Sequence, residues 1–136
     1  MIIKAELNRY RQAPRKVRLL AGLIKGKKVD DANALLAFSG KRAADPIIKL
    51  VNSAVANAIH NFKLSKDALY IKNMRVDGGI VLKRGMPRAF GRSFPIKKKT
   101  SKVLLELGVR ETEKKAEKKT KVKKVTKKAV SKKTAK

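Results

Sequence analysis

The sequence predicts an α+β protein with one compact body, a hairpin arm and a basic C-terminal tail. An alternating segment near the N-terminus is followed by three segments with helical spacing, and these by two more alternating segments. Roughly twenty residues separate the last two segments, whereas an ordinary hairpin loop has about 2–5. We therefore assign residues 1–110 to a single domain, including an arm at 77–100, and residues 111–136 to a tail.

The first strand is predicted from alternation of apolar and charged residues, and the first helix from apolar residues at helical spacing. A strand is expected over residues 2–7, where apolar and charged residues alternate. A helix is expected to begin at Pro14, because a first turn does not need the N–H that proline lacks, and to stop at Gly26. Its apolar residues recur at helical intervals: Val17, Leu20, Ala21 and Ile24.

A second, short helix is expected next. Asp30 is the residue expected to cap it, and it ends near residues 39–40. The side chains expected to face the core are Leu35, Leu36 and Phe38.

The third helix keeps its apolar spacing from Ile47 to Phe62, which makes it the longest periodic segment. Its start has two interpretations. Either Asp45 caps the helix with Pro46 at its first position, or Pro46 kinks a helix that begins near Lys41. We favour the kink, because residues 41–44 include good helix formers.

Two strands complete the body, over about residues 68–76 and 96–107. One face of the first is expected to carry Tyr70, Met74 and Val76, and one face of the second Val103, Leu105 and Leu107. The segment between them is either disordered or an arm that becomes ordered on a partner. Its charge and its small residues favour the arm.

The tail is a series of Lys pairs spaced mainly by Ala, Val and Thr, without an aromatic residue or glycine. Such a composition buries too little apolar area to offset the entropy lost on ordering. We therefore expect residues 111–136 to be disordered in the isolated protein.

The charge of the chain predicts a polyanionic partner. Against 10 Asp and Glu residues stand 37 Lys and Arg residues, which gives a net charge of +27. Residues 1–110 hold 25 basic and 7 acidic residues, so the body carries +18, and the tail carries +9 from 12 and 3. The body is therefore basic in its own right.

Composition and motifs disfavour several classes of protein. The absence of cysteine excludes disulfides, thiolate metal sites and cysteine nucleophiles. No apolar run approaches the ~20 residues of a membrane span, and no signal-peptide core follows Met1. We expect a soluble, cytoplasmic protein without a membrane partner; a plastid protein is the alternative.

Enzymatic chemistry has little support in the sequence. The only histidine, His60, is expected to be structural or exposed, and no phosphate-binding Gly-Lys-Ser/Thr loop or metal-ligand spacing occurs. We therefore expect no catalytic residue, metal, cofactor or small-molecule substrate.

Two basic segments are candidates for contacts with nucleic acid. Residues 82–92 combine four cations with two glycines, a proline and no acid, so their backbone can follow an irregular anionic surface. The first helix carries Arg15, Lys16 and Arg18, which are either a solvated face or phosphate contacts. We favour phosphate contacts, because Glu6 is the only acid before residue 30.

The third helix also has a polar side. Its residues, which are either simply exposed or in contact with sugar and backbone groups of RNA, are Asn52, Ser53, Asn57 and Asn61.

Three motifs resemble the family of ribosomal protein twenty-two of the bacterial large subunit, the universal uL22 family. The first is Pro14-Arg15-Lys16-Val17-Arg18-Leu19, followed by Ile24-Lys25-Gly26-Lys27. The second is the long-helix segment at residues 49–61. The third is the arm segment Lys83-Arg84-Gly85-Met86-Pro87-Arg88-Ala89-Phe90-Gly91-Arg92. The resemblance covers roughly residues 3–107, and the tail lies outside it.

The resemblance implies three helices packed on a small antiparallel sheet, with a long protruding β-hairpin. It implies a structural constituent of the large ribosomal subunit whose partners are 23S rRNA and neighbouring ribosomal proteins. The body is then expected on the outer face of the subunit. The hairpin tip is expected to help line the nascent-peptide exit tunnel and to meet the nascent peptide there.

The resemblance and the charge together give the expected site residues. Those expected to bind rRNA are Arg15, Lys16, Arg18, Lys83, Arg84, Arg88, Arg92, Lys97, Lys98 and Lys99. Those expected at the tunnel-lining tip are Gly85, Met86, Pro87, Arg88 and Ala89. The chain departs from the family pattern at Gly85, usually a branched apolar residue, and at Lys102, usually histidine. Pro95 is expected to interrupt the returning strand.

A different function is suggested by the tail alone. A free nucleic-acid compactor would resemble linker-histone-like bacterial proteins in its Lys-rich tail. Such a protein would need only that tail, and its body would carry no shaped arm of Arg, Gly and Pro. The arm therefore favours the ribosomal function.

Overall fold

The computed structural model describes residues 2–110. In chain order its elements are β1 (Ile2–Tyr10), α1 (Pro14–Ile24), α2 (Val29–Phe38), α3 (Ala44–Phe62), η1 (Lys66–Ala68), β2 (Leu69–Pro87), η2 (Ala89–Gly91) and β3 (Ser93–Val109). The tail at 111–136 lies outside the described residues, so its disorder stays a prediction.

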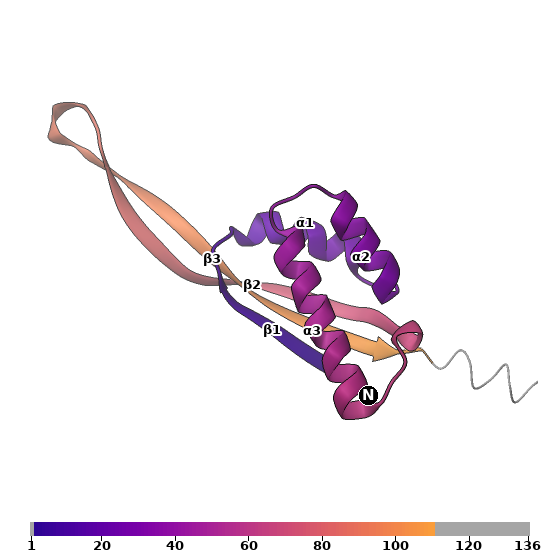
Figure 1. Ribbon diagram of the computed structural model, residues 1–136. Helices are drawn as coiled ribbons and strands as arrows, with labels where there is room; N and C mark the ends of the chain where they lie inside the picture. The colour runs from indigo at the N-terminus through magenta and orange to yellow at the C-terminus, as the bar shows by residue number, and fades with distance from the viewer. Residues whose placement is uncertain (1, 111–136) are drawn as a thin grey trace, which may run out of the picture.

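One antiparallel sheet organises the molecule. Its strand order is β1-β3-β2, so β3 pairs with both of the other strands. The three helices cover one face of this sheet, and β2 and β3 continue beyond the body as a two-stranded arm (Figure 1). The predicted α+β fold, with three helices on a small antiparallel sheet and a long protruding hairpin, is confirmed.

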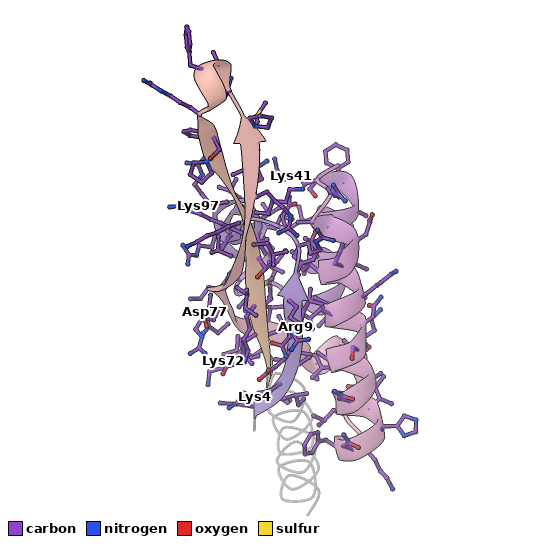
Figure 2. The ribbon with its side chains drawn as sticks, turned by 90° about the vertical axis from the view of Figure 1, so that its left-hand side faces the viewer. Lys4, Arg9, Lys41, Lys72, Asp77 and Lys97 are labelled. Atoms are coloured by element: carbon purple, nitrogen blue, oxygen red, sulfur yellow. The ribbon has the colours of Figure 1, made fainter. Side chains whose placement is uncertain are left out.

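The two faces of the sheet differ in character. Charged side chains such as Lys72, Asp77 and Lys97 lie on the side away from α3 (Figure 2).

No helix of the described residues, 2 to 110, is long and apolar enough to cross a membrane.

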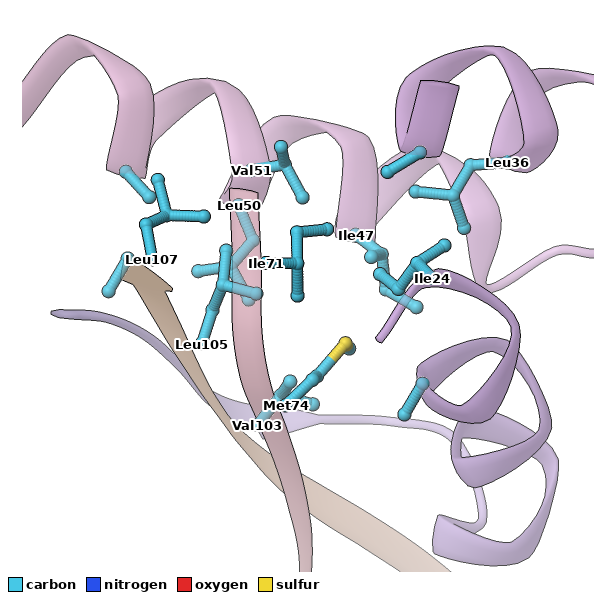
Figure 3. Packing of buried hydrophobic residues seen from close by; sticks show 14 of the residues in the cluster. Ile24, Leu36, Ile47, Leu50, Val51, Ile71, Met74, Val103, Leu105 and Leu107 are labelled. Carbon is cyan, nitrogen blue, oxygen red and sulfur yellow. The ribbon is translucent and has the colours of Figure 1, made fainter. Parts of the chain in front are cut away.

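The hydrophobic core lies between the helices and the covered face of the sheet (Figure 3). The predicted set Val103, Leu105 and Leu107 on β3 is fully buried, as are Ile47 and Val51 on α3. The buried apolar residues form a single cluster, which is expected for a body of about 110 residues.

Helix α1 agrees with its prediction. It begins at Pro14, and its buried residues are Val17, Leu20, Ala21 and Ile24. It ends at Ile24, and Gly26 follows with φ of 80°, in the left-handed region that glycine adopts without strain. The Gly26 N–H donates to the carbonyl of Ile71 (2.8 Å), which links the end of α1 to β2.

The start and the face of α2 differ from the prediction. The helix begins at Val29, so Asp30 lies in its first turn and is not the cap. The buried residues are Val29, Ala32 and Leu36, which recur at helical intervals. Phe38 lies two positions beyond Leu36, about 200° further around the helix. It is 93% exposed instead of facing the core.

The favoured kink in α3 is wrong. The helix begins at Ala44, and the turn before it is closed by the Ala44 N–H, which donates to the carbonyl of Lys41 (2.7 Å). Pro46 therefore lies in the first turn, where its missing N–H costs no helical hydrogen bond. The neighbouring Asp45 also lies in the first turn, where a carboxylate is favoured by the helix dipole.

The predicted face of β2 is wrong at Tyr70. Ile71 pairs with Leu107 and Asn73 pairs with Glu106, so Lys72 is an extra residue in the strand. This β-bulge reverses the alternation, because every later side chain moves to the opposite face. Before it Leu69 and Ile71 are buried, and after it Met74 and Val76 are buried. Tyr70 lies on the open face, over Gly108.

The expected interruption at Pro95 is also wrong, since β3 runs through it opposite Gly85. At the tip the Arg88 N–H donates to the Arg92 carbonyl (2.8 Å), so these residues form a hydrogen-bonded pair. Such pairs alternate with non-hydrogen-bonded pairs along an antiparallel ladder. Pro95 and Pro87 both fall on non-hydrogen-bonded pairs, where the N–H that proline lacks would point away from the partner strand.

Replacing Gly108 by alanine is expected to lower the free energy of unfolding by about 0.5–1 kcal/mol, the value of the exposed cation–π contact that the Tyr70 ring would lose. A Cβ at this position would lie 2.8 Å from two carbons of the Tyr70 ring, so the ring must leave its place beside Arg110. Gly22→Ala is the matched control. Nothing lies within 4 Å of its Cβ, and alanine in a helix should stabilise by about 0.5–1 kcal/mol. Urea unfolding of both variants would reveal the opposite signs; a stable Gly108→Ala variant would contradict the packing argument.

Candidate nucleic-acid interface

The arm is a continuous antiparallel hairpin that extends the β2–β3 ladder. Pairing runs without a gap from Val81 opposite Lys99 to Pro87 opposite Ser93. The two strands were predicted over about residues 68–76 and 96–107. In the structure β2 continues to Pro87 and β3 begins at Ser93, because each residue of one strand finds a partner in the other. The arm projects well beyond the helices (Figure 1). A two-stranded ribbon of this kind holds its side chains at a fixed spacing along the length of the arm.

The arm carries cations that face one another. Lys83 lies directly opposite Lys97, and like charges in such cross-strand pairs repel. Between residues 78 and 100 the chain contains no acidic residue that could neutralise them. The repulsion would be relieved by an anionic partner, so the arm suits a phosphate backbone better than water.

A second β-bulge marks the base of the arm. Gly78 pairs with Ser101 and Val81 pairs with Lys99, so two residues of β2 oppose Thr100 alone. The Thr100 hydroxyl donates to the carbonyl of Ile80 (2.7 Å). An added Cβ on Gly79, the other bulged residue, would lie 2.6 Å from the same hydroxyl oxygen. Thr100 and a residue without a side chain therefore fix the direction in which the arm leaves the body.

Gly79→Ala is expected to shift or broaden the orientation of the arm. Its methyl group would displace the Thr100 hydroxyl and disrupt the hydrogen bond to Ile80, at a cost of about 1 kcal/mol. Gly78→Ala is the control, because nothing lies within 4 Å of its Cβ. The chain has no cysteine, so Ala89→Cys and Asn57→Cys can carry spin labels on arm and body. Identical distance distributions in the two alanine variants would contradict this role of the bulge.

A basic hollow of about 410 Å³ lies where the arm joins the body. Five cations line it together with Gln12, Ala13, Leu82 and Thr100, and no acid does: Arg11, Lys16, Arg42, Lys98 and Lys99. The loop before α1 is held against β3 by Ser101, whose hydroxyl donates to the Gln12 carbonyl (2.5 Å). This contact brings Arg11 next to the base of the arm.

A second hollow, of about 620 Å³, adjoins the first through Ala13, Lys16 and Lys99, which line both. It adds Arg15 and Arg18 to the basic surface. The first turn of α1 contains no acidic residue and has no side-chain cap, so the positive end of its dipole reinforces these cations.

Arg18 has a structural contact as well. Its Nε–H donates to the carbonyl of Val76 (3.1 Å), which ties α1 to β2 just before the arm. This bond orients the guanidinium, whose terminal nitrogens remain the part expected to meet phosphate.

The predicted site residues fall into two groups. The structure brings one group together around the adjoining hollows: Arg15, Lys16, Arg18, Lys98 and Lys99. The other group is spread along the arm toward its tip: Lys83, Arg84, Arg88, Arg92 and Lys97. The expected tip residues, Gly85 to Ala89, form the end of β2 and the start of the turn.

Two cations of the hollow, Arg11 and Arg42, were not among the site residues expected from the sequence. They are far apart in the chain, and the Tyr10 hydroxyl, which donates to the carbonyl of Arg42 (3.4 Å), brings them close. Burial raises the pKa of the Tyr10 phenol, so this group stays neutral at neutral pH and adds no negative charge. The sequence signal for Arg11 was the pair of cations, Arg9 and Arg11, that flanks Tyr10.

Three acids of the described residues form ion pairs. Among residues 2–110 the ion pairs are Lys66–Asp30, Arg75–Asp77 and Lys102–Glu6. None of these pairs involves a cation of the hollows or the arm. Lys102, a departure from the family pattern, is thus bound to Glu6 on the neighbouring strand.

The polar side of α3 is exposed, as is His60. Asn52 accepts a hydrogen bond from the Asn33 amide (3.2 Å) of α2, so it also has a structural contact. In the described part of the chain no group of three His, Asp or Glu side chains could hold a metal ion.

This combination of a small α+β body, a long hairpin and an excess of cations is that of a ribosomal protein. The chain belongs to the family described as Ribosomal protein L22p/L17e, whose model matches residues 5–108. Membership makes it a structural constituent of the large ribosomal subunit.

Several relatives carry the description Large ribosomal subunit protein uL22. That of Desulfitobacterium hafniense (strain DSM 10664 / DCB-2) is 50% identical over 100 residues, which cover 74% of this chain and 88% of the relative. That of Mycoplasma capricolum subsp. capricolum is 49% identical over 105 residues, covering 77% and 95%. That of Onion yellows phytoplasma (strain OY-M) is 48% identical over 102 residues, covering 75% and 79%. The resemblance seen in the sequence is confirmed.

Proposed function

We propose that this protein binds 23S rRNA within the large ribosomal subunit and that its hairpin tip helps line the nascent-peptide exit tunnel. The observation that carries the proposal is the continuous basic surface, free of acids, that runs from the hollows beside α1 along the arm. Neighbouring ribosomal proteins and the nascent peptide are the further partners. No catalytic step is part of this function.

The body is the anchoring part of the interface. Arg15 and Lys16 on α1 lie beside Lys99 on β3, so one stretch of RNA backbone can meet cations from two elements. Phosphate contacts of this kind supply affinity and fix orientation without reading sequence. The shape of the hollows, and not base contacts, would then select the RNA segment.

The arm is the part of the interface that would extend toward the tunnel. Its guanidinium groups can bond phosphate in a bidentate manner, and the small residues near the tip let RNA backbone approach. Gly85, Met86 and Pro87 form the last paired positions of β2 before the turn, so they are the residues proposed to reach the lumen. Gly85 lacks the branched apolar side chain that is usual in the family, so it would fill less of the lumen at this point.

Salt-resistant sedimentation tests this proposal. The full chain should co-sediment with large subunits at salt concentrations that release it from bulk DNA. A shaped surface that fits one RNA site retains contacts when counterion release is suppressed, whereas a Lys-rich compactor does not. Equal loss from DNA and from large subunits would support the compactor and overturn the ribosomal proposal.

Deletion of residues 111–136 is expected to flatten the salt dependence of rRNA binding and to leave the choice of site intact. The tail contributes 12 cations that act as point charges, and counterion release does not depend on sequence. The measurement is the affinity for 23S rRNA at several salt concentrations, together with its footprint. A truncated chain that loses its preference for large-subunit rRNA would show that the tail recognises a site.

A further inference from the structure

At the tip of the arm an aromatic residue adopts a backbone conformation that is unfavourable for a residue with a bulky side chain. Phe90 has φ of 57° and ψ of 37°, in the left-handed region, and Gly91 follows with φ of 68°. The Arg92 N–H closes the turn on the carbonyl of Ala89 (3.4 Å). Two central residues with positive φ are characteristic of a type I′ turn, whose preferred sequence is Asn-Gly. Phenylalanine in this position strains the backbone.

No contact of the Phe90 ring within the described part of the protein compensates for this strain. Phe90 is 99% exposed, and it belongs to neither the core nor the residues packed against it. For comparison, Phe94 in the adjoining part of β3 is 58% exposed. The ring therefore offers its whole apolar surface to a partner.

The surroundings of the ring indicate what that partner is. Its neighbours in the chain, Ala89 and Gly91, are small and do not crowd it, while Arg88 and Arg92 follow on either side. An exposed aromatic group between cations is the arrangement with which proteins hold single-stranded nucleic acid. The cations hold the backbone and the ring stacks on a base.

We propose that Phe90 stacks on an unpaired base of the large-subunit rRNA and thereby fixes the tip of the arm in place; this inference rests on the proposed rRNA binding. Base stacking tolerates any sequence, because every base has a π face, so the residue would act as an anchor and not as a reader. The strained turn leaves the ring fully exposed at the end of the ribbon.

RNA is favoured over the nascent peptide as the occupant because of charge. Residues 82–92 contain four cations and no acid, and Lys97 to Lys99 lie on the opposite strand. Such a field concentrates phosphate groups around the tip, whereas a growing peptide has no fixed sign of charge. The peptide remains an alternative outcome of the test.

The first experiment uses the absence of tryptophan from the chain. The variant Phe90→Trp, in the full protein, introduces a single fluorophore at the tip. Phe38→Trp is the matched control, because Phe38 is 93% exposed at the end of α2. Binding to purified 23S rRNA should quench the tip fluorophore strongly and leave the control unchanged. An unquenched tip, or equal quenching at both positions, would overturn the proposal.

The second experiment separates the ring from the turn. Phe90→Asn creates the preferred Asn-Gly turn, so the arm keeps its shape while the ring is lost. Phe90→Asn and Phe90→Leu should weaken binding of the full chain to 23S rRNA by about 5- to 150-fold, and Phe90→Tyr should retain it. Unchanged or tighter binding by Phe90→Asn would refute stacking. Unchanged binding together with altered passage of nascent chains would assign the ring to the peptide.

The footprint of the wild-type protein separates a failure of stacking from a failure of the proposed rRNA binding. If it binds 23S rRNA with a defined footprint while the tip fluorophore is not quenched, stacking alone fails. If it shows no preference for large-subunit rRNA, the proposed function fails and the stacking proposal fails with it.

Discussion

Truncation of Leu105 to alanine is expected to lower the free energy of unfolding by about 2–5 kcal/mol. Leu105 lies on β3, the central strand, and its side chain is fully buried between the helices and the sheet. Removing it creates a cavity that the strand cannot close, because β3 is paired on both sides. A small domain has only about 5–15 kcal/mol of stability in total, so this variant would be near its limit.

Leu104→Ala is the matched control for this prediction. It removes the same atoms from the adjacent residue, whose side chain lies on the open face of the sheet between Glu6 and Arg75. Because the Leu104 side chain is only partly buried and no helix covers it, its truncation should cost about 1–2 kcal/mol, less than that of Leu105. Denaturant unfolding followed by circular dichroism measures both variants. Equal losses would mean that the helices do not cover the face assigned to them.

The double variant Arg88→Ala with Arg92→Ala is expected to release the arm tip from rRNA while the fold persists. The hydrogen bond between these two residues involves backbone atoms only, so it survives in the variant. Each lost guanidinium should weaken docking of the arm by about 1–3 kcal/mol, the value of a charge-assisted hydrogen bond. Stability of the free protein should stay nearly unchanged, because exposed charges contribute little to it.

Chemical footprinting of 23S rRNA in reconstituted subunits measures this effect. Protection near the tunnel should disappear while the footprint of the body persists. Lys4→Ala is a suitable control, because it removes an exposed cation from β1, outside the hollows and the arm. Equal loss of both footprints would mean that the arm does not dock independently. Intact footprints would remove the two arginines from the set of RNA contacts.

The sequence by itself determined the fold class, the helix α1 and the positions of most cations. These follow from local rules, since Pro14 starts a helix, Gly26 ends one, and apolar residues repeat with the period of the element. Family membership was also visible, because each of the three motifs that carry the resemblance is contiguous in the chain. The start of α3 was missed because helix-forming residues at 41–44 do not show that a turn precedes the helix.

Only the tertiary structure decided the faces of the strands and the composition of the basic hollow. Whether Tyr70 faces the core depends on the bulge at Lys72, and a bulge is visible only once the partner strand is known. Arg11 and Arg42 meet Lys98 because the sheet and the loop before α1 bring them together. The strain at Phe90 likewise arises from closure of the two strands around the turn. Local sequence sets the period of each element, whereas pairing between distant segments sets register, strain and the grouping of charge.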